Sequence, residues 1–192
     1  MTDLKKFLEE NKEKIHDLLN HMWHTIERIA IRLEDKIPDI DLDNSHGNFI
    51  ELADGWVESY YANPSIGFPY GEIGYSLDGL FCVFSINSTK VDEKLLVKIT
   101  ELFQENESIT CQIYGGDDCF TTFYHSKDAS DFDELLKSIK KSKENVLQLE
   151  INVAAFSEED VRESFIESIY VLYQFLETNE ILEQLPMYEV ED

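Results

Sequence analysis

The sequence predicts an α+β protein: a mostly antiparallel sheet built from hairpins, with a long N-terminal helix, two middle helices and a buried C-terminal helix. Two observations lead to this fold class. Apolar residues recur at helical spacing over residues 3–34 and again over 158–178. Between them, short apolar runs come in pairs around turn residues. Strands that come in pairs favour an antiparallel sheet over a Rossmann-like fold, in which strands alternate singly with helices.

The first helix is expected over residues 3–34, because apolar side chains fall on one stripe while lysines and glutamates cover the other side. Pro38 ends this segment. Thr89 with Asp92 is expected to cap the first middle helix. The remaining elements follow in chain order: strands at 48–52, 56–61, 71–77 and 80–86, a helix at 91–106, strands at 109–114 and 119–124, a helix at 131–143, a strand at 146–153 and a helix at 158–178.

The clearest hairpin is centred on Asp78 and Gly79, because a two-residue Asp-Gly turn between strand-like runs is a strong hairpin signal. The strand at 80–86 is apolar on both faces, so it is expected at the centre of its sheet. The two-residue loop predicts that one face carries the cross-strand pairs Leu77–Leu80, Tyr75–Cys82 and Ile73–Phe84.

Residues 1–178 are expected to form one domain, with residues 179–192 as an acidic tail. The last helix is apolar nearly all round between Ile169 and Leu176, where Gln174 is the one polar residue. A single contact with the sheet cannot bury such a helix on every side. We therefore expect a second buried side, either within the chain or in a homodimer formed through this helix.

Charge excludes two classes of partner. The chain has 40 Asp and Glu residues against 16 Lys and Arg, for a formal net charge of −24. Such a field repels the phosphates of nucleic acid and the surface of an anionic membrane. The partners that it favours are a basic protein, a basic peptide or metal ions. Solubility alone or adaptation to salt would also account for the acidity.

Cytoplasmic location and free thiols are expected from the absence of export signals. The apolar runs are far shorter than the roughly 20 residues that span a bilayer. The charged first residues lack the apolar core of a signal peptide. An odd number of cysteines without a CxxC pair predicts reduced thiols and no disulfide at Cys82, Cys111 and Cys119.

One acidic segment partly matches a calcium-binding loop. Asp39, Asp41 and Asp43 have the alternate spacing of the first ligands. The sixth position is Asn44, where the loop needs glycine, and the twelfth is Ile50, where it needs glutamate. The segment is therefore interpreted as a solvated linker.

A possible zinc site on the first helix is also incomplete. Asp17, His21 and His24 share one helical face. A zinc site usually has three or four protein ligands, and the next residue along this exposed face is the cation Arg28. We expect no metal ion here.

Catalytic and cofactor motifs are absent from the sequence. The glycines Gly115 and Gly116 are followed by Asp117 and Asp118, whereas a phosphate loop needs a basic residue and a helix N-terminus. There is no GxSxG motif and no clear nucleophile–base pair. No cofactor and no catalytic residue is therefore assigned.

An acidic, aromatic stretch is the best candidate for a binding surface. From Ile37 to Thr89 there are eight acids and no Lys or Arg. Aromatic and acidic side chains on one strand face form a surface that accepts Lys or Arg. A face that is charged for solubility is the plain alternative. The expected partner-binding residues are Trp56, Glu58, Tyr60, Asp54 and Glu72.

Three segments resemble a family of uncharacterised archaeal proteins of unknown function: Met22-Trp23, GEIGYSLDGLFCVFSI at 71–86 and KSKENVLQLEINV at 141–153. This resemblance implies no activity or site. The order of elements and the acidity resemble, in architecture only, the acidic chaperones of type III secretion, which are α+β homodimers that bind an extended stretch of a partner protein. By charge alone, the chain is also similar to acidic immunity proteins that neutralise basic nucleases.

The functional prediction is a non-enzymatic intracellular interaction module, chaperone-like or inhibitor-like, that binds a cationic protein or peptide segment. The alternative is a small-ligand-binding domain or an enzyme with a pocket on the sheet. A shallow acidic surface would favour the first, and a deep pocket with buried carboxylates or histidines would favour the second.

Overall fold

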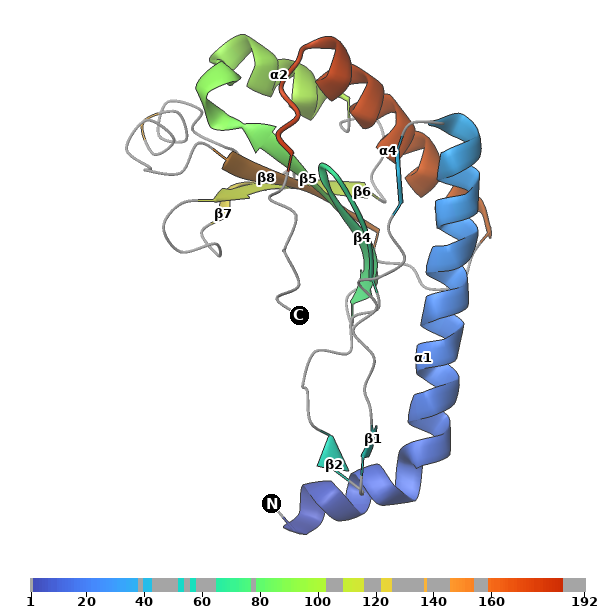
Figure 1. The fold of residues 1–192 in the computed structure, drawn as a ribbon. Helices are drawn as coiled ribbons and strands as arrows, with labels where there is room; N and C mark the ends of the chain where they lie inside the picture. The colour runs from blue at the N-terminus through green and yellow to red at the C-terminus, as the bar shows by residue number, and fades with distance from the viewer. Residues whose placement is uncertain are drawn as a thin grey trace, which may run out of the picture.

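The fold is described from a computed structural model of the chain (Figure 1). The structure describes residues 2–37, 40–42, 52–53, 56–57, 65–76, 79–102, 109–115, 122–125, 137, 146–153 and 159–184. The helices are α1 (Thr2–Lys36), α2 (Glu93–Glu101) and α4 (Glu159–Thr178). The strands are β1 (Leu52–Ala53), β2 (Trp56–Val57), β3 (Ser65–Phe68), β4 (Gly71–Ser76), β5 (Gly79–Asn87), β6 (Ile109–Gly115), β7 (Thr122–His125) and β8 (Val146–Val153).

Six strands form one antiparallel sheet in the order β3-β4-β5-β8-β6-β7. The α+β fold class and the antiparallel sheet are thus confirmed. The strand β5 lies inside the sheet between β4 and β8, as its two apolar faces predict. The short strands β1 and β2 pair with each other, and the rest of the two strands predicted there lies outside the described residues.

The hairpin of β4 and β5 forms, but its register differs from the predicted one. Ser76 pairs with Gly79, and Tyr75 pairs with Leu80. Tyr75 and Ile73 thus each pair with a residue two positions away from the expected partner, and Leu77 lies outside the described residues. Because Gly79 pairs with Ser76, it is the first residue of β5 and not a central residue of the turn. Its φ of 129° is a conformation that glycine adopts readily. A shift of two residues leaves the same side chains on the same face, because strand side chains alternate with a period of two.

The strand β3 has no counterpart in the sequence prediction. It covers four residues at the edge of the sheet, and Pro69 follows it directly. A proline beside a short segment predicts a loop, and proline is tolerated only at edges of sheets. The segment is nevertheless a strand because Ile66 and Phe68 are buried in the core.

The three described helices share one apolar core with one face of the sheet. The C-terminal half of α1 contributes Ile26, Ile29 and Leu33, which are buried. The N-terminal part of α1 extends past the sheet, where Phe7 is 58% exposed and Leu18 is also exposed (Figure 1). No helix in the described ranges is both long and apolar enough to cross a bilayer.

Two ion pairs align α1 with α4. Arg32 pairs with Glu163, and Lys36 pairs with Glu167, so both partners lie four residues apart on their helices. The Lys36 ammonium also lies 5.2 Å from the ring centre of Tyr170. Exposed pairs of this kind contribute only about 0–1 kcal/mol each. They therefore set the position of α4 along α1 more than they stabilise the fold.

The helix α2 begins at a different cap from the predicted pair. The Leu95 amide donates to Asp92 Oδ1 at 2.8 Å, so Asp92 is itself the N-cap residue. Thr89 lies in the preceding 3-10 turn, Ser88–Lys90, where its amide and hydroxyl both donate to Asn87 Oδ1.

The chain reverses after α4 and returns to the sheet. Glu180 has φ 55°, and the Ile181 amide donates to the Leu176 carbonyl, which closes the helix end. The Asn87 amide then donates to Ile181 O, and the Glu183 amide donates to Ser85 O. Residues 181–183, which the sequence assigns to the acidic tail, therefore pair with the end of β5. Residues 185–192 lie outside the described part of the chain.

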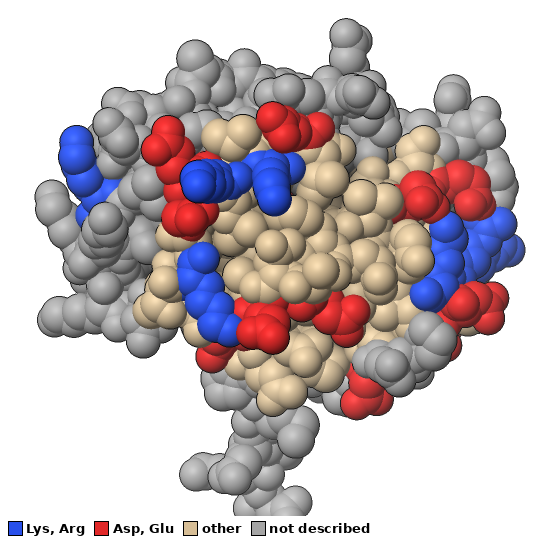
Figure 2. Space-filling model, turned by 90° about the horizontal axis from the view of Figure 1, so that it is seen from above, with Lys and Arg blue, Asp and Glu red and all other residues tan. Residues whose placement is uncertain are grey.

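The helix α4 has two buried sides and one open one. Ile169, Leu172 and Leu176 are buried in the core, and α1 lies along a second side. Val171 remains 38% exposed. Seen from above, the helical side of the protein has a broad uncharged area in the middle of the described surface (Figure 2). The first helix thus supplies the second contact that the apolar sequence of α4 demands.

Candidate functional site

The two faces of the sheet differ in chemistry. Ile73, Cys82 and Ile151 pair across β4, β5 and β8 and are fully buried beneath the helices. Their neighbours Glu72 and Glu150 lie on the opposite face, because side chains alternate along each strand. The residues of this second face are not part of the apolar core that the described helices cover.

One row of residues crosses this second face. Glu72 on β4 is opposite Val83 on β5, and Val83 is opposite Glu150 on β8. The backbone register continues the row to Gln112 on β6 and His125 on β7. Two strand spacings separate the glutamates, so their Cα atoms are about 10 Å apart. Glu72 is exposed and Glu150 is half-buried.

The C-terminal segment brings a third carboxylate to the same face. The bridge between Ile86 and Leu182 places Glu183 opposite Ser85, two residues along β5 from Val83. Glu183 is half-buried, whereas Ser85 is fully buried and its hydroxyl has no hydrogen-bond partner among the described residues. We call Glu72, Glu150 and Glu183, around Val83 and Ser85, the carboxylate face.

Charge on the sheet has one sign. The eight strands that the structure describes contain two acids, Glu72 and Glu150, and no Lys or Arg. Both acids lie on the carboxylate face. A cationic group that approaches this face therefore meets no repelling base from the strands themselves. The arrangement is suited to holding lysine or arginine side chains by charge-assisted hydrogen bonds.

Cys82 lies directly beneath this face, in the core. Burial raises the pKa of its thiol well above the usual value, and the negative charges of Glu72 and Glu150 raise the pKa further. The thiol is thus protonated at neutral pH, and a protonated thiol is neither a nucleophile nor a metal ligand. Cys82 is a free cysteine, as expected; Cys111 and Cys119 are outside the residues whose side chains are described.

We expect the stability of the protein to fall at alkaline pH because of Cys82. Below about pH 8.5, the usual thiol pKa, the cysteine is protonated both folded and unfolded. Above it, only the unfolded chain loses the proton, so the free energy of unfolding falls by up to about 1.4 kcal/mol per pH unit. Urea denaturation between neutral and alkaline pH measures this slope. The Cys82→Ala variant should lack this part of the slope, and equal slopes for the two proteins would contradict the assignment.

The structure places one of the five sequence-predicted site residues on this face. Glu72 is exposed on β4. Trp56 lies in β2 and pairs with Ala53, but its side chain is outside the described part of the structure. The other three, Asp54, Glu58 and Tyr60, also lie outside the described residues.

Sequence reasoning missed Glu150 and Glu183. Glu150 lies between the buried residues Leu149 and Ile151. The two-residue period of β8 was therefore a signal that Glu150 faces away from the core. That Glu150 lies close to Glu72 could not be found in this way, because it depends on the order of strands in the sheet.

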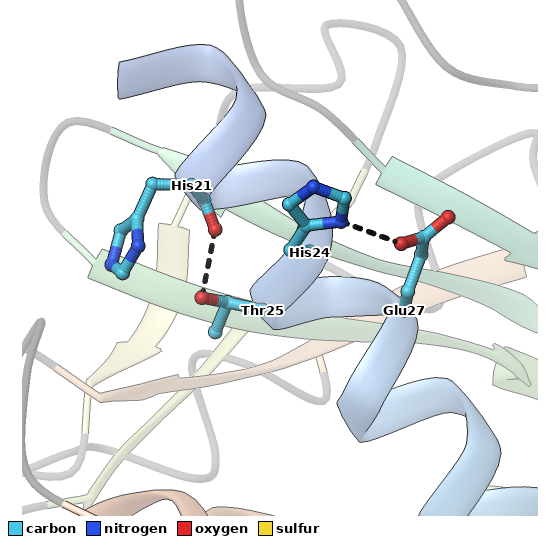
Figure 3. A network of polar contacts seen from close by, with 4 residues as sticks. All are labelled: His21, His24, Thr25 and Glu27. Atoms are coloured by element: carbon cyan, nitrogen blue, oxygen red, sulfur yellow. Dashed lines mark hydrogen bonds and ion pairs between the residues drawn. The ribbon is translucent and has the colours of Figure 1, made fainter. Parts of the chain in front are cut away.

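The side chains of His21 and His24 on α1 point in different directions (Figure 3). His24 Nδ1 lies 3.0 Å from Glu27 Oε2, and its ring is turned toward that carboxylate. The backbone carbonyl of His21 accepts a hydrogen bond from the Thr25 hydroxyl. Within the described ranges, no three His, Cys, Asp or Glu side chains are placed to hold a metal ion. Most of the acidic segment at 39–50 lies outside those ranges.

Comparison with known proteins places the chain in a family. Residues 17–174 match the model of a family described as a protein of unknown function (DUF3201). The chain belongs to this family. The predicted resemblance to an uncharacterised family is thereby confirmed for most of the DUF3201 chain.

A solved structure shows the same fold. It is a conserved hypothetical protein from Pyrococcus furiosus, with a TM-score of 0.62 and 22% sequence identity. The match covers 88% of this DUF3201 chain and 99% of the other one. No curated protein matches the sequence. These matches establish the family and the fold and name no activity, so a function has to be argued from the carboxylate face.

Proposed function

We propose that this DUF3201 protein is a non-enzymatic interaction module that binds a lysine- or arginine-rich segment of another protein on the carboxylate face. The observation that carries the proposal is the charge of the sheet. Its strands contain no Lys or Arg, and both of their acids lie on the face away from the core. Glu183 adds a third carboxylate at the edge of that face.

The spacing of the carboxylates suits an extended basic segment. In an extended chain, every second side chain points to the same side, at intervals of about 6.6 Å. Glu72 and Glu150 are about 10 Å apart across Val83, a separation that the flexible stems of lysine or arginine can bridge. The half-buried ring of Phe81, which pairs across the sheet with Asn152, offers apolar contact beside the charges.

The charge of the whole chain assists such binding. A net charge of −24 steers a cationic partner toward the protein and makes association sensitive to salt. Each exposed ion pair contributes only about 0–1 kcal/mol, so an aromatic anchor is also needed. Trp56 and Tyr60, flanked by Asp54 and Glu58, remain the expected anchors, as the sequence predicts.

The position of Cys82 argues against a catalytic role for this thiol. It is the one thiol whose side chain lies in the described part of the structure, and it faces the core with its pKa raised. A nucleophilic thiol would need the opposite: exposure and a lowered pKa.

Binding of a labelled oligo-lysine peptide, followed by fluorescence anisotropy, tests the proposal. The double variant Glu72→Lys and Glu150→Lys should weaken binding about tenfold, because it replaces two attractions by two repulsions. The matched control is Glu34→Lys with Asp35→Lys, two exposed acids on α1. Replacing one acid by lysine makes the net charge more positive by two. Both double variants therefore change it from −24 to −20.

The control variant should change the affinity by no more than about twofold, since exposed charges beyond a Debye length of about 10 Å are largely screened. Equal losses in the two double variants would show that binding follows net charge, and the assignment to the carboxylate face would be wrong. An affinity that does not change between low and high salt would contradict the electrostatic basis itself.

A further inference from the structure

One side of α4, next to its exposed acids Glu163 and Glu167, carries no charged residue. Ser164, Ser168, Val171 and Phe175 recur every three or four residues, so they lie within an arc of about 60° on the helix. Val171 is exposed and the other three are half-buried. We call these four residues the α4 face. It belongs to a helix that packs on the core side of the sheet, whereas the carboxylate face is on the other side.

The other two sides of α4 are already occupied. The core takes up one side, and the ion pairs with α1, made by Glu163 and Glu167, take up another. The α4 face is the remaining side. An uncharged surface of this kind is unusual in a chain in which 29% of the residues are charged.

The charges beside the α4 face indicate what covers it. Along one margin, Arg32 and Lys36 alternate with Glu163 and Glu167, and all four side chains are roughly half exposed. A strongly basic partner would meet the two cations there, and a strongly acidic partner would meet the two carboxylates. A second copy related by a two-fold axis can place its acids beside the bases of the first copy, and its bases beside the acids.

Net charge also restricts where two copies can meet. Each copy carries −24, so most pairings of their surfaces bring like charges together. An uncharged centre with a margin of mixed sign avoids that repulsion. The serines Ser164 and Ser168 are small enough to let two helices approach closely, with Val171 near the axis.

From these observations we infer that two copies of this chain associate through the α4 face, with their α4 helices packed against each other about a two-fold axis. This inference does not depend on the proposed function, because the carboxylate face lies on the other side of the sheet and takes no part in such a contact.

Sedimentation velocity across the micromolar range tests the inference on the full chain. The wild-type protein should sediment as a dimer. Val171→Glu places an unpaired carboxylate at the centre of the contact, so it should raise the dimer dissociation constant by about thirtyfold or more. The matched control is Ile31→Glu, which makes the same change at a residue of α1 that is 59% exposed. It should leave the dimer unchanged.

Circular dichroism establishes that both variants fold, as expected for substitutions at exposed positions. A wild-type monomer throughout the concentration range would overturn the inference. Equal weakening by the two variants would also overturn it, since the added charge alone would then account for the loss.

Salt separates this inference from the proposed function. Raising the ionic strength from about 0.1 M to about 1 M shortens the Debye length from about 10 Å to about 3 Å. Dimerisation should then strengthen, because the repulsion between two copies is screened, whereas binding of the oligo-lysine peptide should weaken. A dimer that dissociates as salt is added would contradict an uncharged contact, whatever the peptide does.

Discussion

Replacing Phe84 by alanine is expected to lower the free energy of unfolding by about 3–5 kcal/mol, the usual cost of removing a buried phenylalanine side chain. Phe84 is fully buried in the middle of β5. Its ring makes an edge-to-face contact with Phe68, with 5.4 Å between ring centres, and lies 6.4 Å from the ring of Tyr173. It thus joins the edge strand β3 to the helix α4.

Urea denaturation followed by circular dichroism measures this change. The matched control is Phe7→Ala, which removes the same atoms from a side chain that is 58% exposed on α1. It should change stability by no more than about 0.5 kcal/mol. If both variants lost equal stability, the core would not be organised around β5 as described.

Sequence patterns predicted the elements whose own residues decide their structure. The alternation of apolar residues in Val146–Val153 gave β8 its correct bounds, and the helical spacing of apolar residues located α1 and α4 to within two residues. The apolar character of β5 on both faces also predicted its place inside the sheet. In each case the pattern is local, so one sequence is enough to identify it.

Features that depend on distant contacts could not be predicted in the same way. The strand β3 is short and followed by proline, and only the burial of Ile66 and Phe68 against the rest of the core makes it a strand. Residues 181–183 have the composition of a polar tail, because their pairing with β5 requires the chain to reverse at Glu180. Local propensity carries no information about such long-range pairing.

The candidate site shows the same division. Glu72 could be singled out from its acidic, aromatic neighbourhood in the sequence. Glu150 is 78 residues away in the chain, and it joins Glu72 only because β8 inserts between β5 and β6. Glu183 joins both through the C-terminal segment. A binding surface assembled across strands in this order is visible only once the topology is known.

The second large effect is expected at Gly71, the first residue of β4. A Cβ atom at this position would lie 1.8 Å from the carbonyl oxygen of Val83 and 2.8 Å from its carbonyl carbon. Both atoms belong to the backbone of β5, which cannot rotate away as a side chain can. Gly71→Ala should therefore destabilise the protein by about 3 kcal/mol or more, at or above the upper end of the usual cost of overpacking.

Gly74→Ala is the matched control, three residues along the same strand. Its Cβ would meet Phe81 at 2.3 Å, but the contact is with the far end of a half-buried ring that can turn aside. Urea denaturation should therefore show a clearly smaller loss for Gly74→Ala than for Gly71→Ala. A loss at Gly74 equal to or larger than that at Gly71 would contradict the close approach of β4 to β5. Since Gly71 precedes Glu72, the same approach also sets where the first carboxylate of the carboxylate face lies.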